Sequence, residues 1–206
     1  MDVPQAKLDE FLASCHQVAR RGLVRCSSGN MSVRLDETRM LVSATRSWME
    51  SIDAGQVAIC RIADGERLEG SRPTVELGFH TGILRTRPDV NVVLHFQTPH
   101  ATALACCAAD DIDFNVIPEI PFYIGPVARV PYLPPGSKQL AAAVAGAMAS
   151  HDLVVMSNHG LVTAAADYAH AIQNAEFFEL ACQVITLNQG RSRPLSAQDV
   201  AGLQSA

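Results

Sequence analysis

Hydrophobic and polar positions follow two periods along this chain of 206 residues. Between residues 5 and 21, apolar positions recur three and four residues apart, which predicts an amphipathic helix that ends before Gly22. Residues 31–35 alternate between apolar and polar, which is typical of a half-buried strand, and residues 40–43 would return as its hairpin partner. The same patterns predict strands at 57–62, 91–95 and 153–156, a strand at 161–163 that continues or pairs with the last of these, and helices at 73–87, 98–109, 137–149 and 167–187.

The order of these elements predicts the fold class. Strands and helices are interspersed without a repeat or a linker, so we expect one α/β layered domain over residues 1–206 with some antiparallel strand pairs. The chain is 48% hydrophobic but only 5% aromatic. Its core must therefore be built mainly from Ala, Val, Leu and Ile.

Charge and cysteine content narrow the function classes. The formal net charge is -5, so the chain lacks the positive charge that is typical of nucleic-acid-binding proteins, and a small acidic enzyme is favoured. The six cysteines include the adjacent pair Cys106-Cys107 and show no CxxC spacing, which indicates reduced thiols in a cytoplasmic protein. The amino terminus lacks the features of a secretion signal, and no apolar run approaches the roughly 20 residues that span a bilayer, so we expect no membrane partner.

Two histidines close short apolar segments and are candidate metal ligands. His95 closes the short segment 91–94, which is apolar from residue 92, and His159 comes shortly after the apolar residues 153–156, so each would lie where a strand ends. Gln97 is two residues beyond His95 and would face the same side. The pattern fits a metal site completed by a ligand from a distant strand, and equally two hydrogen-bonded histidines at strand ends.

Two further segments carry polar groups near the starts of predicted elements. Glu76 lies in the first turn of the helix opened by Pro73 and capped by Thr74, where the helix dipole alone would stabilise it or where it would serve as an acid/base. His80 lies four residues later on the same helix face and is interpreted as a supporting or core histidine rather than a ligand. The turn at 27–30 either binds an anion through backbone N–H groups or is only a turn.

Five segments, taken in order, carry a resemblance to a known family. They read Gly29-Asn30-Met31-Ser32-Val33-Arg34, Ser43-Ala44-Thr45-Arg46, Pro73-Thr74-Val75-Glu76, His95-Phe96-Gln97 and His159-Gly160. With this order and spacing the chain resembles the class II aldolase/adducin family over residues 5–187. The resemblance implies a three-layer α/β/α fold with a largely antiparallel central sheet, assembled as a homotetramer with active sites between subunits.

The resemblance also implies a metal-dependent lyase that cleaves a small hydroxylated carbonyl substrate of the sugar-phosphate kind. In such enzymes a divalent ion, commonly zinc and alternatively manganese, iron or cobalt, polarises the carbonyl and stabilises the enediolate, while a carboxylate moves the proton. Decarboxylation, dehydration and epimerisation on the same site are alternatives to retro-aldol cleavage. A non-catalytic, adducin-like assembly protein is the other alternative.

The family's functional residues carry over to positions of this chain. His95 and His159 match two metal ligands, and Glu76 matches the catalytic carboxylate. The groups on the phosphate side of the substrate match Gly29, Asn30, Thr45 and Thr74.

Four positions depart from the family pattern. Gln97 stands where the family has a third histidine, and its amide oxygen is a weaker ligand for zinc than imidazole. Arg46 replaces a glycine and would bind a substrate carboxylate or phosphate, while Val75 replaces a serine and removes a hydroxyl from the phosphate side. Phe122 stands where an aldolase of the family has an active-site tyrosine, with Tyr123 beside it and Tyr132 nearby. These replacements make the proton donor and the substrate the open questions.

Overall fold

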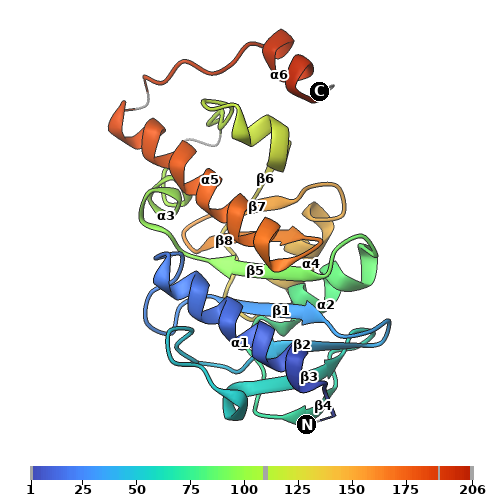
Figure 1. The fold of residues 1–206 in the computed structure, drawn as a ribbon. Helices are drawn as coiled ribbons and strands as arrows, with labels where there is room; N and C mark the ends of the chain where they lie inside the picture. Colours follow the sequence, from blue (N-terminus) through green and yellow to red (C-terminus); the bar gives the residue numbers. More distant parts are fainter. Residues whose placement is uncertain (1, 109–110, 190, 205–206) are drawn as a thin grey trace.

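The computed structural model describes residues 2–108, 111–189 and 191–204, which form an eight-stranded sheet with helices on both faces (Figure 1). The strands are β1 (Asn30–Arg34), β2 (Arg39–Ser43), β3 (Val57–Arg61), β4 (Arg67–Gly70), β5 (Val92–Phe96), β6 (Val127–Val130), β7 (Leu153–Met156) and β8 (Gly160–Ala165). The helices are α1 (Gln5–Arg20), α2 (Leu77–Thr86), α3 (Pro99–Ala105), α4 (Lys138–Ala147), α5 (Tyr168–Leu187) and α6 (Ala197–Gln204), with the short turns η1 (Ala54–Gln56) and η2 (Ile120–Ile124).

The sheet has the strand order β4-β3-β2-β1-β5-β8-β7-β6. Each neighbouring pair is antiparallel except β6 and β7, which are parallel. The largely antiparallel sheet that the family resemblance implies is therefore confirmed. The pairing of β1 with β5 sets Asn30 opposite His95, and the antiparallel pairing of β7 with β8 makes residues 160–165 a hairpin partner rather than a continuation.

Two hydrophobic cores lie on the two faces of the sheet. α1, α3 and α5 supply one core, in which Phe11, Phe96 and Phe178 are fully buried. α2 and α4 supply the other, in which Phe79 packs among aliphatic side chains. Figure 1 shows α1 and α5 in front of the sheet, with α2 and α4 behind it. This is the three-layer α/β/α arrangement.

The segment from Pro73 to Glu76 differs from its prediction as a helix start. α2 begins only at Leu77, and Pro73 instead forms an antiparallel bridge with Ala44. The backbone N–H of Thr74 donates to the carbonyl of Ser43 at 3.1 Å, so pairing with the end of β2 satisfies groups that a helix start would leave unpaired. Glu76 therefore stands at the residue before the helix, on a chain segment held against the sheet.

The remaining differences are small. The helix predicted to run to residue 109 ends at Ala105, and residues 109 and 110 lie outside the described part of the chain. Each of the six cysteines is free of a disulfide bond, and Cys15, Cys60 and Cys182 are buried. Within the described residues, no helix combines the length and the apolar character needed to cross a membrane.

Candidate metal centre and active site

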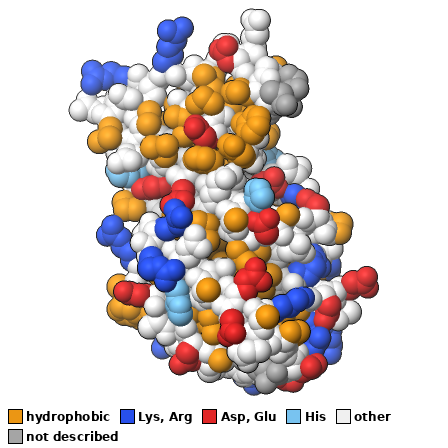
Figure 2. Space-filling view, in the orientation of Figure 1, with side chains coloured by type: hydrophobic (Ala, Val, Ile, Leu, Met, Phe, Trp, Pro, Cys, Tyr) orange, Lys and Arg blue, Asp and Glu red, His pale blue; other side chains and the backbone are white. Residues whose placement is uncertain are grey.

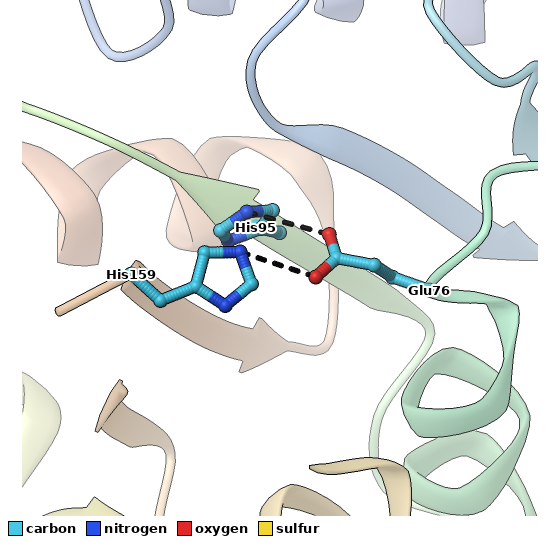
Figure 3. Close-up of side chains that lie close together, drawn as sticks. All are labelled: Glu76, His95 and His159. Atoms are coloured by element: carbon cyan, nitrogen blue, oxygen red, sulfur yellow. Dashed lines mark ion pairs between the residues drawn. The ribbon is translucent and has the colours of Figure 1, made fainter. Parts of the chain in front are cut away.

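Three side chains from distant parts of the chain meet at one end of the central strands (Figure 3). Glu76 precedes α2, His95 is on β5, and His159 lies in the short turn between β7 and β8. Glu76 Oε2 is 3.4 Å from His95 Nε2, and Glu76 Oε1 is 3.2 Å from His159 Nε2. One potential ligand atom from each residue lies within 4.8 Å of the others, so a single cation would contact all three.

The hydrogen bond made by the other nitrogen of His95 sets the state of its imidazole. His95 Nδ1 lies 2.8 Å from the carbonyl oxygen of Leu161, which can only accept, so Nδ1 carries the proton. In the neutral ring Nε2 then carries a lone pair that points toward the Glu76 carboxylate. This is the usual way in which proteins orient a metal-binding histidine.

A lone pair facing a carboxylate in a buried site requires a positive charge between them. Glu76 and His95 are only 6% and 2% exposed. A proton is disfavoured at His159, because burial, and after it the charge of His95, lower the pKa of His159, although Glu76 opposes them. Among the described residues, Glu76 Oε1 and His159 Nδ1 are buried without a hydrogen-bond partner. The residues present therefore fit a divalent cation bound by nitrogen and oxygen donors, as zinc, manganese, iron or cobalt would be.

The two oxygens of Glu76 have different surroundings. Asn30 on β1 donates its side-chain N–H to Oε2 at 2.9 Å. Oε1 receives no such bond from the described residues. One carboxylate oxygen is thus fixed by the protein, and the other is free for a cation or for a proton.

Behind Asn30 lies a chain of buried polar groups. Asn30 Oδ1 is hydrogen-bonded to His80 Nε2, and His80 Nδ1 is 2.8 Å from the hydroxyl of Ser32. Burial, followed by the charge of His95, lowers the pKa of His80 to about 3, so its ring is neutral at neutral pH. His80 lies outside the candidate metal cluster of Glu76, His95 and His159, and its interpretation as a supporting or core histidine stays a prediction.

The candidate site also needs close backbone packing. Asn158, directly before His159, adopts φ of 55°, a left-handed conformation that asparagine tolerates. A Cβ on Gly160 would lie 2.7 Å from Gln97 Cγ and 2.9 Å from the carbonyl oxygen of Phe96. Only glycine lets the turn carrying His159 approach the end of β5, because any side chain there would clash with backbone.

The bridge between Ala44 and Pro73 brings together three of the predicted substrate-binding residues, Thr45, Arg46 and Thr74. The backbone N–H of Thr45 donates to the carbonyl of Arg72 at 3.0 Å, and Thr74 is buried two residues before Glu76. Arg46 is exposed and has φ of 62°, a left-handed conformation that glycine adopts readily. The structure thus places Thr45, Arg46 and Thr74 on adjoining segments that lead to the Glu76 cluster.

Gln97 is half-buried directly after β5, and its amide is tied to the neighbouring turn. Its Nε2 donates to the carbonyl oxygen of His159 at 2.6 Å. Because that oxygen can only accept, the amide orientation is fixed, and Oε1 is the atom left over for another partner. Coordination of a metal by Gln97 stays a prediction.

Sequence reasoning missed how Asn30 and Ser32 support the carboxylate. Asn30 was assigned to the phosphate side, a role that stays a prediction, whereas its side-chain amide in the structure links Glu76 to His80. Ser32 was placed on the polar face of a half-buried strand, yet it is fully buried because α2 covers that face. Asn30 and Ser32 are both polar strand residues that face the buried His80 of α2. This arrangement can be recognised only after β1 and α2 have been placed next to each other.

Comparison with known proteins agrees with this geometry. The sequence model of the Class II Aldolase and Adducin N-terminal domain matches residues 9–186. The chain is 30% identical to 3-oxo-tetronate 4-phosphate decarboxylase of Escherichia coli K12, covering 98% of this chain and 97% of that protein. It is 29% identical to L-fuculose phosphate aldolase of Methanococcus maripaludis, covering 86% and 94%. The crystal structure of YgbL from Escherichia coli superimposes with a TM-score of 0.91 at 28% identity, covering 97% of this chain and 98% of that chain.

Proposed function

Because this chain belongs to the class II aldolase and adducin family, we propose that it is a metal-dependent enzyme that breaks a carbon–carbon bond beside a carbonyl group of a small phosphorylated substrate. The observation that carries the proposal is the buried cluster of Glu76, His95 and His159. A non-catalytic assembly protein has no need for a carboxylate and two imidazoles that face one another without hydrogen bonds. The adducin-like alternative is therefore the weaker one.

Each residue of the cluster has a distinct part. His95, His159 and Glu76, the last through Oε2, would hold the ion, and Gln97 would add its free oxygen. A divalent ion bound there supplies a Lewis acid that draws electron density from the substrate carbonyl. Zinc is the metal we propose first, with manganese, iron and cobalt as alternatives.

Glu76 is the residue that would move the proton. When the carbon–carbon bond breaks, its electron pair stays on the carbon beside the carbonyl, and that carbon then takes up a proton. Glu76 Oε1 has no hydrogen-bond partner among the described residues, whereas Oε2 is held by Asn30. We therefore assign the proton transfer to Oε1.

Decarboxylation of a phosphorylated 3-oxo acid fits these residues better than retro-aldol cleavage. Carbon dioxide leaves without a proton to remove, so one acid/base suffices, whereas retro-aldol cleavage must also take a proton from the hydroxyl of the departing aldehyde. Phe122 has no hydroxyl where an aldolase of the family has a tyrosine, and the hydroxyl of Tyr123 is displaced by one position. The 30% identity to 3-oxo-tetronate 4-phosphate decarboxylase over nearly the whole chain supports the same choice. Retro-aldol cleavage is the second candidate, supported by the 29% identity to L-fuculose phosphate aldolase.

The experiment that tests the reaction uses the purified chain loaded separately with zinc, manganese, iron(II) and cobalt. Phosphorylated 3-oxo acids and ketose phosphates are offered, and released carbon dioxide and released aldehyde are measured. We expect carbon dioxide from a 3-oxo acid. Aldehyde release alone would establish the second candidate, and the absence of both products with every metal would overturn the enzyme proposal.

Replacing Arg46 with glycine tests how the substrate is held. Glycine adopts the left-handed backbone at φ of 62° without strain, which stabilises the folded state. Glycine also gives the unfolded chain more conformational entropy, which has the opposite effect. The free energy of unfolding should therefore change by less than about 1 kcal/mol. Loss of a charge-assisted hydrogen bond of about 1.5–3 kcal/mol should raise the KM about 10-fold to 100-fold. Steady-state kinetics measure this, with Arg20→Ala on the exposed side of α1 as control.

The two anionic groups of the substrate can be told apart with the same variant. If Arg46 binds the carboxylate, the KM rises for the 3-oxo acid and stays unchanged for a phosphorylated ketose without a carboxylate. If Arg46 binds the phosphate, the KM rises for both compounds. An unchanged KM for both would show that Arg46 does not contact substrate.

Replacing Gln97 with histidine tests whether this position contacts the metal. Imidazole is a better zinc ligand than an amide oxygen, so we expect zinc to bind at least about tenfold more tightly while the fold is retained. Competition with a chromophoric zinc chelator measures the dissociation constant. Gln5→His, which adds an imidazole to an exposed position at the start of α1, is the matched control. Weaker or unchanged zinc binding in Gln97→His would remove Gln97 from the ligand set.

We also propose that residues 1–206 act as one domain and assemble as a homotetramer. Figure 2 shows hydrophobic side chains gathered over the upper part of the molecule, where Figure 1 shows α5, η2 and α6. Four large apolar residues of α5 and η2 are exposed: Phe122, Tyr123, Leu180 and Leu187. Apolar surface of this kind favours contact with another copy of the chain.

A further inference from the structure

We propose that His80 is a positioning residue for Glu76. Through Asn30, His80 determines which oxygen of the Glu76 carboxylate stays hydrogen-bonded to the protein and which one is free to react. The inference rests on the proposed function, in which Glu76 is the acid/base. His80 itself touches neither Glu76 Oε1 nor any of the three atoms of the candidate metal cluster. It acts only through the amide of Asn30.

The hydrogen bonds of the chain have one direction. A carboxylate oxygen can only accept, so the Asn30 group that faces Glu76 Oε2 must be its N–H, at 2.9 Å. Asn30 Oδ1 then faces His80 and accepts from Nε2–H. His80 Nδ1 is left without a proton and accepts from the Ser32 hydroxyl at 2.8 Å. Ser32, His80 and Asn30 thus donate in sequence toward Glu76.

The imidazole of His80 supports this orientation of the Asn30 amide from its other side. A side-chain amide is nearly symmetric in shape, and a half-turn of Asn30 would present its oxygen to the Glu76 carboxylate and repel it. Such a half-turn would also set the amide N–H of Asn30 against the Nε2–H of His80. His80 therefore holds Asn30 in the orientation that binds Oε2.

Burial makes this control necessary. Ser32 and His80 are fully buried and Asn30 and Glu76 are each 6% exposed, so no bulk water replaces a lost hydrogen bond. Asn30 is the residue that hydrogen-bonds the Glu76 carboxylate within the described chain. Without it the carboxylate would be free to rotate, and neither oxygen would have a fixed role.

The experiment compares His80→Leu with His80→Gln in the full chain. Leucine removes the donor to Asn30, whereas glutamine can place an amide N–H near the position of Nε2–H. For His80→Leu we expect the zinc dissociation constant, measured by chelator competition, to rise about 10-fold to 100-fold, as for other groups that orient metal ligands. His80→Gln should restore most of the wild-type affinity. His16→Leu, which removes a half-buried histidine of α1, should leave zinc affinity unchanged.

A histidine that only fills the core would give a different result. His80→Leu and His80→Gln would then lower the melting temperature without changing the zinc affinity of the folded protein, and that outcome would overturn the proposal. If leucine prevents folding, Ser32→Ala takes its place, because it removes only the donor to Nδ1. A smaller loss of zinc affinity is expected from Ser32→Ala, and an unchanged affinity would count against a positioning role.

The tautomer of His80 gives a readout that needs neither metal nor turnover. Nitrogen-15 NMR of the metal-free wild-type protein should show the proton of His80 on Nε2 and none on Nδ1. The opposite tautomer would overturn the proposal. If the protein turns over no substrate but His80 has the expected tautomer and controls zinc affinity, the proposed function fails while the positioning role stands.

Discussion

Replacing Glu76 with glutamine should lower turnover at saturating metal by about a thousandfold, within the range for loss of a general acid/base. Glutamine has the shape of glutamate, and its amide oxygen can accept the hydrogen bond that Asn30 donates to Oε2. The fold should therefore persist. Its amide cannot carry a proton to the substrate carbon, so the chemical step is lost.

Stability provides the internal check on this variant. The metal-free wild-type protein buries a carboxylate against two imidazoles, at 3.4 Å from His95 and 3.2 Å from His159. A neutral amide removes the buried negative charge, so the melting temperature of metal-free Glu76→Gln should equal or exceed that of the wild type. Turnover and thermal unfolding are measured together, with the exposed Glu37→Gln as control. Turnover within about tenfold of the wild type would show that Glu76 is not the acid/base.

Replacing His159 with alanine should remove metal binding. His159 lies in the turn between β7 and β8 and is partly exposed, so its loss leaves a smaller void than the loss of fully buried His95 would. We expect the dissociation constant for zinc to rise by more than the roughly 100-fold that marks the upper range for groups that only orient ligands. Turnover at low metal concentration should fall with it.

Metal content and affinity decide this prediction. Elemental analysis after dialysis should find close to one ion per chain in the wild type and a small fraction of that in His159→Ala. The control is His170→Ala, which removes an exposed histidine paired with Asp167 at the start of α5. Equal metal content in His159→Ala and the wild type would place the metal elsewhere or exclude it.

The sequence predicted the three residues of the cluster better than it predicted their support. Glu76, His95 and His159 were identified because each follows a recognisable strand or helix signal and matches a family motif. Their mutual distances depend on contacts between segments 19 to 83 residues apart in sequence, which periodicity cannot supply. The family resemblance supplied that long-range information.

Errors arose where tertiary contacts overrode a local signal. Pro73 is a good first residue for a helix, yet its segment pairs with the end of β2 because the bridge to Ala44 satisfies its backbone. Gln97 lies directly beyond the end of β5 at Phe96, and a Cβ on Gly160 would lie near both Gln97 Cγ and His95 Cε1, so the expected position of Gln97 beside His95 is not contradicted and its role stays a prediction. Its contact with His159 follows from the turn between β7 and β8.

The strand order has a consequence for how the protein holds together. β1 to β4 form one half of the sheet and β5 to β8 the other, and the two halves are joined edge to edge where β1 pairs with β5. Glu76 comes from the first half, whereas His95 and His159 come from the second. An ion bound by Glu76, His95 and His159 would link the two halves of the sheet across the boundary between β1 and β5. Its binding would favour the folded, joined state by about 2.7 kcal/mol when free metal is 100 times the dissociation constant, so the residues proposed for the chemistry would also stabilise the contact between the two halves of the sheet.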